Sequence, residues 1–258
     1  MSGNPVKNTL MVWKALFLKD ALSRFFGSRG AWAWLLIEPC IHIGIMVVMF
    51  TVIRTRVIGG LDVPTWLMVG MMGFFLFRRT SVQGIHALDC NRAFFAFRQV
   101  RPFDTALTSA VVELFAMFWI FVILLVIFAF FRLSVIPENT LTVLSGFFGL
   151  WLLGLGYGLI SSVCMRIVRD SGHLLQILMM PLMFISGVII PMNTIPEPYR
   201  SYVALNPVLH GLECMRLGFW PDYHTLDVSL WYLYGVAMVL LVIGMGLYRS
   251  LETRLVAQ

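Results

Sequence analysis

The chain has 258 residues, of which 59% are apolar and only 12% are charged, and its formal net charge is +6. Soluble domains carry roughly 25% charged residues, so the composition excludes a single aqueous core and favours an all-α polytopic membrane protein. A transmembrane barrel would show segments of about ten residues that alternate between apolar and polar, and no such pattern is visible. The positive charge is explained by membrane orientation, so no nucleic acid partner is expected.

Residues 1–30 predict an amphipathic helix that lies in the membrane interface. Four apolar residues recur at helical spacing, namely Val6, Leu10, Trp13 and Phe17. Lysines beside this stripe can extend to lipid phosphates. Because Asp20 and Arg24 fall on the same stripe and interrupt it, a solvated leader is the alternative.

The first predicted span, 31–53, contains two ionisable residues one helical turn apart. Glu38 and His42 share a face of the helix, where they can share a proton or a hydrogen bond. An ionisable pair inside a membrane helix is costly and points to function. The alternative is a packing contact near the inner interface, because Glu38 lies only about two turns inside the span.

The second predicted span, 63–87, contains the arginine pair Arg78 and Arg79. At 1.5 Å per residue the pair lies about 22 Å from the outer end of the span, in the inner half of a hydrocarbon core about 30 Å thick. Both side chains can reach lipid phosphates from there. Alternatively, one of them faces a polar conduit for an anionic substrate.

The segment Asp89–Asp104 is a basic and aromatic interruption between apolar runs. It predicts a short helix that ends at Pro102, with three phenylalanines as an apolar knob for a soluble partner and three arginines for lipid phosphates or acidic rims. A solvated basic loop is the alternative, although three phenylalanines are unusual in a loop without a binding role. The residues expected to couple the chain to its partner are Asn91, Arg92, Phe94, Phe95, Phe97, Arg98, Arg101, Pro102 and Asp104.

The sequence after Asp104 predicts four further spans, at 106–131, 141–165, 173–190 and 228–248. The span 141–165 is rich in glycine, which permits close helix contacts. The span 173–190 is short and is interrupted by Pro181 and Gly187. In the following section, 191–219, Asn206 and Pro207 occupy the N-cap and first positions of a short apolar helix. Together these features predict a re-entrant outer hairpin, which survives at membrane depth only against protein or a water-filled cavity.

The basic residues predict the orientation of the six spans. An even number of spans places both termini on one side of the membrane. The segments on that side carry 14 of the 19 lysines and arginines. Cytoplasmic loops are enriched in these residues, so both termini and the segment Asp89–Asp104 are expected in the cytoplasm.

Motifs for chemistry within the chain are absent from the sequence. It contains no G-x-x-x-x-G-K-[ST], no G-x-S-x-G and no H-E-x-x-H, so neither a P-loop nor these hydrolase sites are expected. The four cysteines are scattered, without metal-ligand spacing. We therefore expect a transporter without enzymatic activity, metal or cofactor of its own, and the energy must come from another protein.

Three motifs and the order of the elements carry a family resemblance. The motifs are Leu36-Ile37-Glu38-Pro39, the pair Asn91-Arg92 followed by Gln99-Val100-Arg101-Pro102-Phe103-Asp104, and the outer block formed by Asn206, Pro207, His210, Gly211, Glu213 and Arg216. The chain resembles the ABC-2 type permeases along nearly its whole length, and within them it is most similar to the Kps-type permeases of capsular polysaccharide export.

The resemblance implies a homodimer of six-span subunits that binds a separate cytoplasmic ATPase, which would hold ATP and Mg²⁺. Such a permease exports a lipid-linked acidic polysaccharide across the bacterial inner membrane, with a periplasmic co-polymerase and an outer-membrane export protein as further partners. We expect a conduit between the subunits, lined by spans one, two and five, where aromatic faces stack on sugar rings and arginines meet anions. The candidate substrate path is Glu38, His42, Trp66, Phe74, Phe75, Phe77, Arg78, Arg79 and Tyr157.

Three alternatives stay open on the sequence. The first is an ABC-2 exporter of another cargo, such as O-antigen, teichoic acid or a drug. The second is a secondary transporter or channel, which needs an inverted repeat or a carboxylate relay, for which Glu38 and Glu113 are the candidates. The third is a structural membrane scaffold, which is hard to reconcile with a broken span and buried charges.

Overall fold

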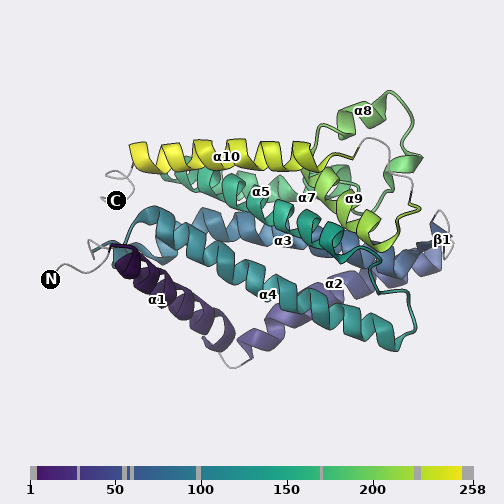
Figure 1. Ribbon diagram of the computed structural model, residues 1–258, viewed down its shortest axis with the longest axis horizontal. Coiled ribbons are helices and arrows are strands. Elements are labelled where there is room, and N and C mark those ends of the chain that lie inside the picture. The colour runs from purple at the N-terminus through teal and green to yellow at the C-terminus, as the bar shows by residue number, and fades with distance from the viewer. Residues whose placement is uncertain are drawn as a thin grey trace.

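Long helices dominate the structure (Figure 1). The computed structural model describes residues 5–27, 30–53, 57–58, 61–96, 100–168, 171–223 and 228–251. The helices of 21 residues or more within these ranges are α1 (Pro5–Phe26), α2 (Ala31–Ile53), α3 (Val63–Cys90), α4 (Pro102–Phe130), α5 (Thr140–Ile167) and α10 (Leu230–Ser250). A short antiparallel hairpin of β1 (Val57–Ile58) and β2 (Leu61–Asp62) joins α2 to α3.

Helix α5 is the central helix of the bundle and packs against α3, α9 and α10. Glycines permit these contacts. A Cβ atom added to Gly158 would lie 3.0 Å from the Cα of Gly84 on α3, and one added to Gly154 would lie 2.8 Å from the carbonyl oxygen of Phe77. Small residues allow helix backbones to approach closely in membranes, so the close helix contact predicted from these glycines is confirmed.

Four helices are long and apolar enough to cross a bilayer: α2, α4, α5 and α10. The chain is therefore a polytopic membrane protein with an all-helical bundle. Helix α3 has 28 residues but is less apolar, because it carries polar side chains such as Arg78, Arg79 and Gln83. The segment predicted as the fifth span contains two short apolar helices, α6 (Ser171–Ile177) and α7 (Met179–Ile185).

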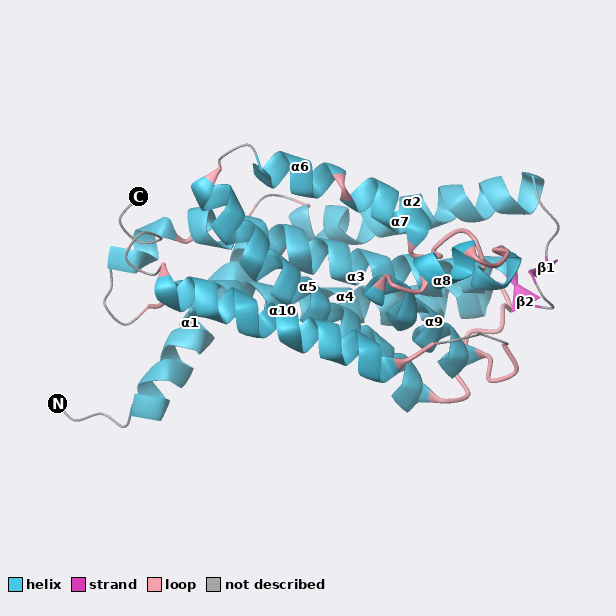
Figure 2. Ribbon diagram, turned by 90° about the horizontal axis from the view of Figure 1, so that it is seen from above, coloured by secondary structure: helices cyan, strands magenta, loops and turns pink. Residues whose placement is uncertain are grey.

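Helices α6 and α7 follow one another along the bundle with a break between them (Figure 2). Pro181 explains the break, since it has no N–H to donate to the carbonyl oxygen four residues earlier. Gly187 follows α7 with a φ of 72°, a left-handed conformation that glycine adopts without steric cost. The chain turns there into the section that the sequence predicts as an outer hairpin.

This section contains η2 (Met192–Thr194), α8 (Tyr199–Val203) and α9 (Pro207–Phe219). The predicted cap of α9 is confirmed, because Asn206 Oδ1 accepts a hydrogen bond from the Val208 N–H at 3.0 Å and Pro207 is the first helical residue. Helix α9 is almost entirely buried and packs against α3, α5 and α10. It lies at the end of the bundle opposite to α1 (Figure 1).

The segment Asp89–Asp104 does not form one helix. Helix α3 continues to Cys90, a 3-10 helix η1 covers Arg92–Ala96, and α4 begins at Pro102. The prediction that Pro102 ends a helix is wrong, because proline is equally favoured at the first position of a helix, where its missing N–H is not needed. Asp104 stabilises that start, since its Oδ2 accepts a hydrogen bond from the Arg101 N–H at 3.1 Å.

Helix α1 packs against α4 with the face that the sequence predicts for lipid. Leu16 is buried on that side and Trp13 is half-buried, whereas Leu10 of the predicted stripe is 57% exposed. Asp20 and Arg24 extend the same face and pair with each other at 3.0 Å. The apparent interruption of the stripe is therefore a polar contact with the rest of the protein.

Candidate functional site

A cavity of about 200 Å³ lies between α2 and α3. Its lining residues are Glu38, Pro39, His42, Phe75, Arg78, Arg79, Val82 and Gln83. Five of them belong to the candidate substrate path predicted from the sequence, including both predicted ionisable pairs. The two helices therefore bring together residues about 40 positions apart in the chain and place two arginines, a carboxylate and an imidazole around one space.

The other four residues of the predicted path lie elsewhere. Trp66, Phe74 and Phe77 are at most 2% exposed in the interior of the subunit, and Tyr157 packs against Phe77 with ring centroids 6.0 Å apart. A side chain that lines a conduit between two subunits must reach the subunit surface. The three buried aromatic rings do not do so in this conformation, and they contribute to the core instead.

Glu38 and His42 line the cavity without a hydrogen bond to each other. The Glu38 Oε2 atom lies 3.4 Å from Nη1 of Arg79. The His42 ring meets the Phe75 ring edge to face, with centroids 5.7 Å apart. The predicted hydrogen bond between the two side chains is wrong, because an arginine on the neighbouring helix provides a stronger partner for the carboxylate.

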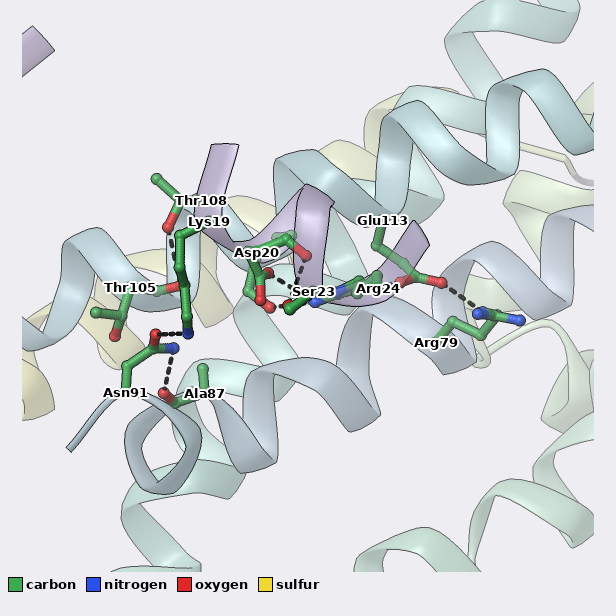
Figure 3. A network of polar contacts seen from close by, with 12 residues as sticks. Lys19, Asp20, Ser23, Arg24, Arg79, Ala87, Asn91, Thr105, Thr108 and Glu113 are labelled. Carbon is green, nitrogen blue, oxygen red and sulfur yellow. Dashed lines mark hydrogen bonds and ion pairs between the residues drawn. The ribbon is translucent and has the colours of Figure 1, made fainter. Parts of the chain in front are cut away.

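The Arg79–Glu38 pair is one end of a chain of ion pairs that reaches α1. Figure 3 shows the part of this chain that runs from Arg79 through Glu113 to Arg24. Arg79 donates through Nε to Oε1 of Glu113 on α4, and Arg24 of α1 donates to Oε2 of the same carboxylate. Arg24 also binds Asp20 at 3.0 Å and the Ser109 hydroxyl at 2.5 Å. Four helices, α1 to α4, thus contribute charges to one connected network.

Glu113 is the centre of this network and is fully buried. A buried carboxylate is costly unless charged and hydrogen-bonding partners compensate it. Here each carboxylate oxygen accepts from a different arginine, so the charge is compensated from two helices. The sequence predicts Glu113 only as a possible relay residue. Its pairing joins residues 89 and 34 positions apart in the chain, so no local sequence signal indicates it.

The same helix α1 also contacts the segment predicted to couple the chain to a partner. Lys19 Nζ donates to Oδ1 of Asn91 at 2.8 Å and lies 5.0 Å from the centroid of the Phe94 ring. Trp13 Nε1 donates to Oδ1 of Asp104 at 2.8 Å. Helix α1 therefore touches both the cavity network and the start and end of the predicted coupling segment.

The predicted coupling residues differ in their exposure. Arg92 and Arg101 are exposed and Phe94 is half-buried, while Phe97 and Arg98 lie outside the described residues. Buried members are Asn91, Phe95, Pro102 and Asp104. Phe95 belongs to the hydrophobic core and is 9% exposed, so the prediction that it projects towards a partner is wrong for this conformation.

The outer motif forms a second cluster of charge around α9. Arg216 and Glu213 are both completely buried and pair at 2.6 Å. Arg216 also donates to the carbonyl oxygens of Gly187 at 2.8 Å and Val188 at 3.0 Å, and its guanidinium carbon lies 3.5 Å from the centroid of the Trp66 ring. One side chain thus joins α9, α3 and the turn after α7.

Small residues and a neutral histidine complete this outer cluster. A Cβ atom on Gly70 would lie 2.2 Å from Nη2 of Arg216, and one on Gly211 would lie 2.5 Å from Leu150. The Ser229 N–H donates to Nδ1 of His210 at 3.1 Å, so Nε2 carries the proton that binds the Ala204 carbonyl oxygen at 2.7 Å. The motif residues therefore have a structural role in fixing the outer section to the bundle.

Tyr223 follows α9 and borders the same cluster. Burial raises the pKa of its hydroxyl to about 12, the nearby Glu213 carboxylate adds to this rise, and Arg216 opposes it. The hydroxyl therefore stays protonated at any physiological pH. Its protonated form is compatible with a closed, charge-neutral cluster.

Comparison with known proteins gives a consistent set of relatives. Residues 11–220 match the family model described as ABC-2 type transporter. The chain is 32% identical over 243 residues to the polysialic acid transport protein KpsM of Escherichia coli, with 93% of each chain covered. It is 22% identical over 232 residues to the capsule polysaccharide export inner-membrane protein CtrC of Neisseria meningitidis serogroup A, covering 90% of this chain and 88% of the relative. For the corresponding protein BexB of Haemophilus influenzae the identity is 23% over 239 residues, covering 93% and 90%.

Proposed function

Since the chain belongs to the ABC-2 type transporter family, we propose that it is the membrane-spanning subunit of an exporter that moves capsular polysaccharide across the bacterial inner membrane. The observation that carries this proposal is the 32% identity to KpsM over 93% of both chains. Two further groups of relatives are named as inner-membrane proteins of capsule polysaccharide export. The cargo is a lipid-linked acidic polysaccharide.

The proposed topology has six spans with both termini in the cytoplasm. Helix α3 and the pair α6–α7 are the two spans beyond the four apolar helices. Helix α3 is about 42 Å long at 1.5 Å per residue, and its Arg79 enters a charged network within the protein instead of facing lipid. Helix α1 and the last turns of α10 lie at the same end of the bundle (Figure 1), which agrees with the distribution of basic residues.

The outer section would be re-entrant in this topology. Helix α9 has 13 residues, about 20 Å at 1.5 Å per residue, which is too short to span the hydrocarbon core. Its burial against three helices meets the condition that non-spanning backbone at membrane depth is shielded by protein. The Glu213–Arg216 pair then lies in the outer half of the membrane, enclosed by the bundle.

Energy would come from a separate cytoplasmic ATPase, because the chain contains no P-loop. That ATPase would hold ATP and Mg²⁺. We place its contact at η1 and the start of α4, where Arg92 and Arg101 are exposed. Phe94 is half-buried and has access to this surface, and Lys19 lies over one face of its ring.

The remaining partners are a second copy of this chain, a periplasmic co-polymerase and an outer-membrane export protein. A homodimer supplies the second wall of the conduit. The cavity between α2 and α3 would belong to the substrate path, since it combines an aromatic ring with two arginines. Aromatic rings stack on sugars, and arginines bind carboxylate and phosphate groups through two parallel hydrogen bonds.

The pairing of Glu113 favours this proposal over a secondary transporter. A proton relay needs a carboxylate that gains and loses a proton during the cycle. Each carboxylate oxygen of Glu113 is instead bound by an arginine from another helix, an arrangement typical of a structural ion pair. Glu113 therefore serves better as a structural counter-charge than as a relay group.

Deletion of the gene with complementation tests the function. We expect the deletion strain to lose surface capsule and to accumulate polysaccharide inside the cell, and the full-length chain to restore export. A tagged chain should co-purify with a P-loop ATPase from its native membrane. Normal capsule in the deletion strain would overturn the polysaccharide assignment. Purification without any ATPase would overturn the ABC transport mechanism.

A further inference from the structure

Arg78 differs from the other arginines at its depth in having no partner in the described part of the chain. It lines the cavity between α2 and α3 and is half-buried. Arg24 and Arg79 form ion pairs with carboxylates, whereas Arg78 forms no ion pair or hydrogen bond with a described residue. An arginine in a membrane helix is costly without a counter-charge and usually marks a site for a ligand or a path for ions.

Arg79 already forms ion pairs with carboxylates of the protein. Its Nε binds the fully buried Glu113 and its Nη1 lies 3.4 Å from Glu38. These contacts occupy the carboxylates nearest to the cavity. The electrostatic consequence is that Glu38 is partly neutralised on the cavity wall, so an incoming anion meets Arg78 with less repulsion from Glu38.

The size of the cavity limits what it can hold. Pockets for drug-sized ligands have volumes of about 300–1,000 Å³, and this one measures about 200 Å³. It therefore fits a single charged group better than a stretch of polymer. The guanidinium fork of arginine matches the oxygens of a phosphate group in geometry as well as in charge.

We infer that Arg78 binds the phosphate group of a lipid in this cavity and that Arg79 is a positioning residue held by Glu113. This binding site does not depend on the proposed function. Only the identity of the bound lipid rests on the proposed function, because the phosphate can belong to the lipid-linked substrate or to a bilayer phospholipid. Binding in the cavity places the phosphate beside Phe75, where an attached sugar would meet an aromatic ring.

Native mass spectrometry of the full-length chain in detergent tests the site, with dioleoyl phosphatidylglycerol as the probe and dioleoylglycerol as the matched lipid without phosphate. Hydrogen bonds between charged groups contribute to the free energy of binding, so Arg78→Gln should weaken phosphatidylglycerol binding about 10- to 100-fold. Arg78→Lys should retain part of the affinity, because it keeps the charge without the fork. Arg249→Gln, an exposed arginine at the end of α10, should bind like the unchanged chain.

The same lipid titration distinguishes the role of Arg78 from that of Arg79. Arg79→Gln should lower thermal stability and affect the affinity less than Arg78→Gln. The inference is overturned if Arg78→Gln binds phosphatidylglycerol normally, or if this substitution weakens the binding of phosphatidylglycerol and dioleoylglycerol equally. It is also overturned if a folded Arg79→Gln variant loses as much affinity for phosphatidylglycerol as Arg78→Gln.

Capsule export in cells carrying Arg78→Gln identifies the source of the phosphate. A loss of export in parallel with the loss of binding assigns the site to the lipid-linked substrate. Normal export with weakened binding supports the site and assigns it to a bilayer phospholipid. Failure of the proposed function is distinct, since it appears as normal capsule in a strain that lacks the whole chain.

Discussion

Two arginine–carboxylate clusters in this protein differ in what surrounds them. The outer cluster pairs Glu213 with Arg216, and both side chains are completely buried. The inner cluster runs from Arg24 through Glu113 to Arg79 and ends at Glu38, whose side chain is 51% exposed. The first is closed by backbone carbonyls and an aromatic ring, while the second opens into a cavity.

The difference shows how the surroundings of a buried charge decide its role. The outer pair is made within one helix, three residues apart, so it cannot report a movement between helices. The inner network joins four helices, and any change in their arrangement must break or replace one of its contacts. A closed pair of this kind fixes a structure, whereas an open network can exchange partners with a ligand.

Arg216→Met tests the closed cluster and should have the largest effect. Removing one partner leaves Glu213 buried and unpaired and also frees two carbonyl oxygens, so we expect a loss of about 3–5 kcal/mol in the free energy of unfolding. Unfolding of the purified chain by SDS titration in mixed micelles measures it. Arg249→Met is the exposed control and should change stability little. A small loss for Arg216→Met would show that the two clusters do not differ as described.

Glu113→Gln tests the open network. The amide keeps the shape but loses the charge, and Arg24 and Arg79 retain Asp20 and Glu38 as partners, so we expect a smaller loss of about 1.5–3 kcal/mol.

Double-mutant cycles check that Glu113 is coupled to both arginines. Combining Glu113→Gln with Arg24→Gln or Arg79→Gln should reveal coupling energies of about 0.5–3 kcal/mol. Glu138→Gln, exposed between α4 and α5, is the control. Additive effects in both cycles would contradict the network.

Gly70→Ala tests how tightly the closed cluster is packed. The new methyl group would lie 2.2 Å from Nη2 of Arg216, so the guanidinium must move away from the Trp66 ring at a cost of about 1–3 kcal/mol. Gly235→Ala on α10 is the matched control, because a Cβ there meets nothing within 4 Å. Its stability should stay the same or rise by up to about 1 kcal/mol. Equal values for the two variants would refute the packing argument.

Lys19→Met should have the smallest effect on stability. Its contacts with Asn91 and Phe94 are partly solvated, and such contacts contribute up to about 1 kcal/mol. We expect a stronger effect on export in cells, because the contact joins α1 to the proposed ATPase surface. Lys14→Met on the exposed side of α1 is the control. Indistinguishable export by the two variants would argue against a role for this contact.

Much of the fold and the family could be predicted from local sequence signals. The ABC-2 family and the relation to capsule export proteins are confirmed. Asn206 and Pro207 fix the start of α9 through backbone chemistry that depends only on neighbouring residues. Pro102 marks a helix boundary correctly, but the sequence does not tell whether the helix lies before or after it, since proline is favoured at a helix start and excluded from its interior.

The candidate site was less accessible from the sequence, because its contacts join distant residues. Glu38 and Arg79 pair although they are 41 positions apart in the sequence. Arg24 and Glu113 pair although they are 89 positions apart. Glu38 and His42 lie one helical turn apart and suggest a local pair. In the structure the Glu38 carboxylate pairs with Arg79 on the next helix instead. Hydropathy also treats Phe95 and Phe94 alike, although only the tertiary packing decides which ring is buried.

The position of Glu113 has a consequence for the way the chain enters the membrane. Helix α3 is synthesised before α4, so Arg79 leaves the ribosome before its buried partner Glu113, and Arg78 leaves it without a partner in the described part of the chain. Each arginine near the centre of a helix opposes translocon insertion by about 2.5–3.5 kcal/mol. We therefore expect α3 to settle stably in the bilayer only once α4 has delivered its carboxylate, and a topology reporter fused before and after α4 would reveal this order. In that case Glu113 acts first as an assembly signal that lets two helices insert as a unit.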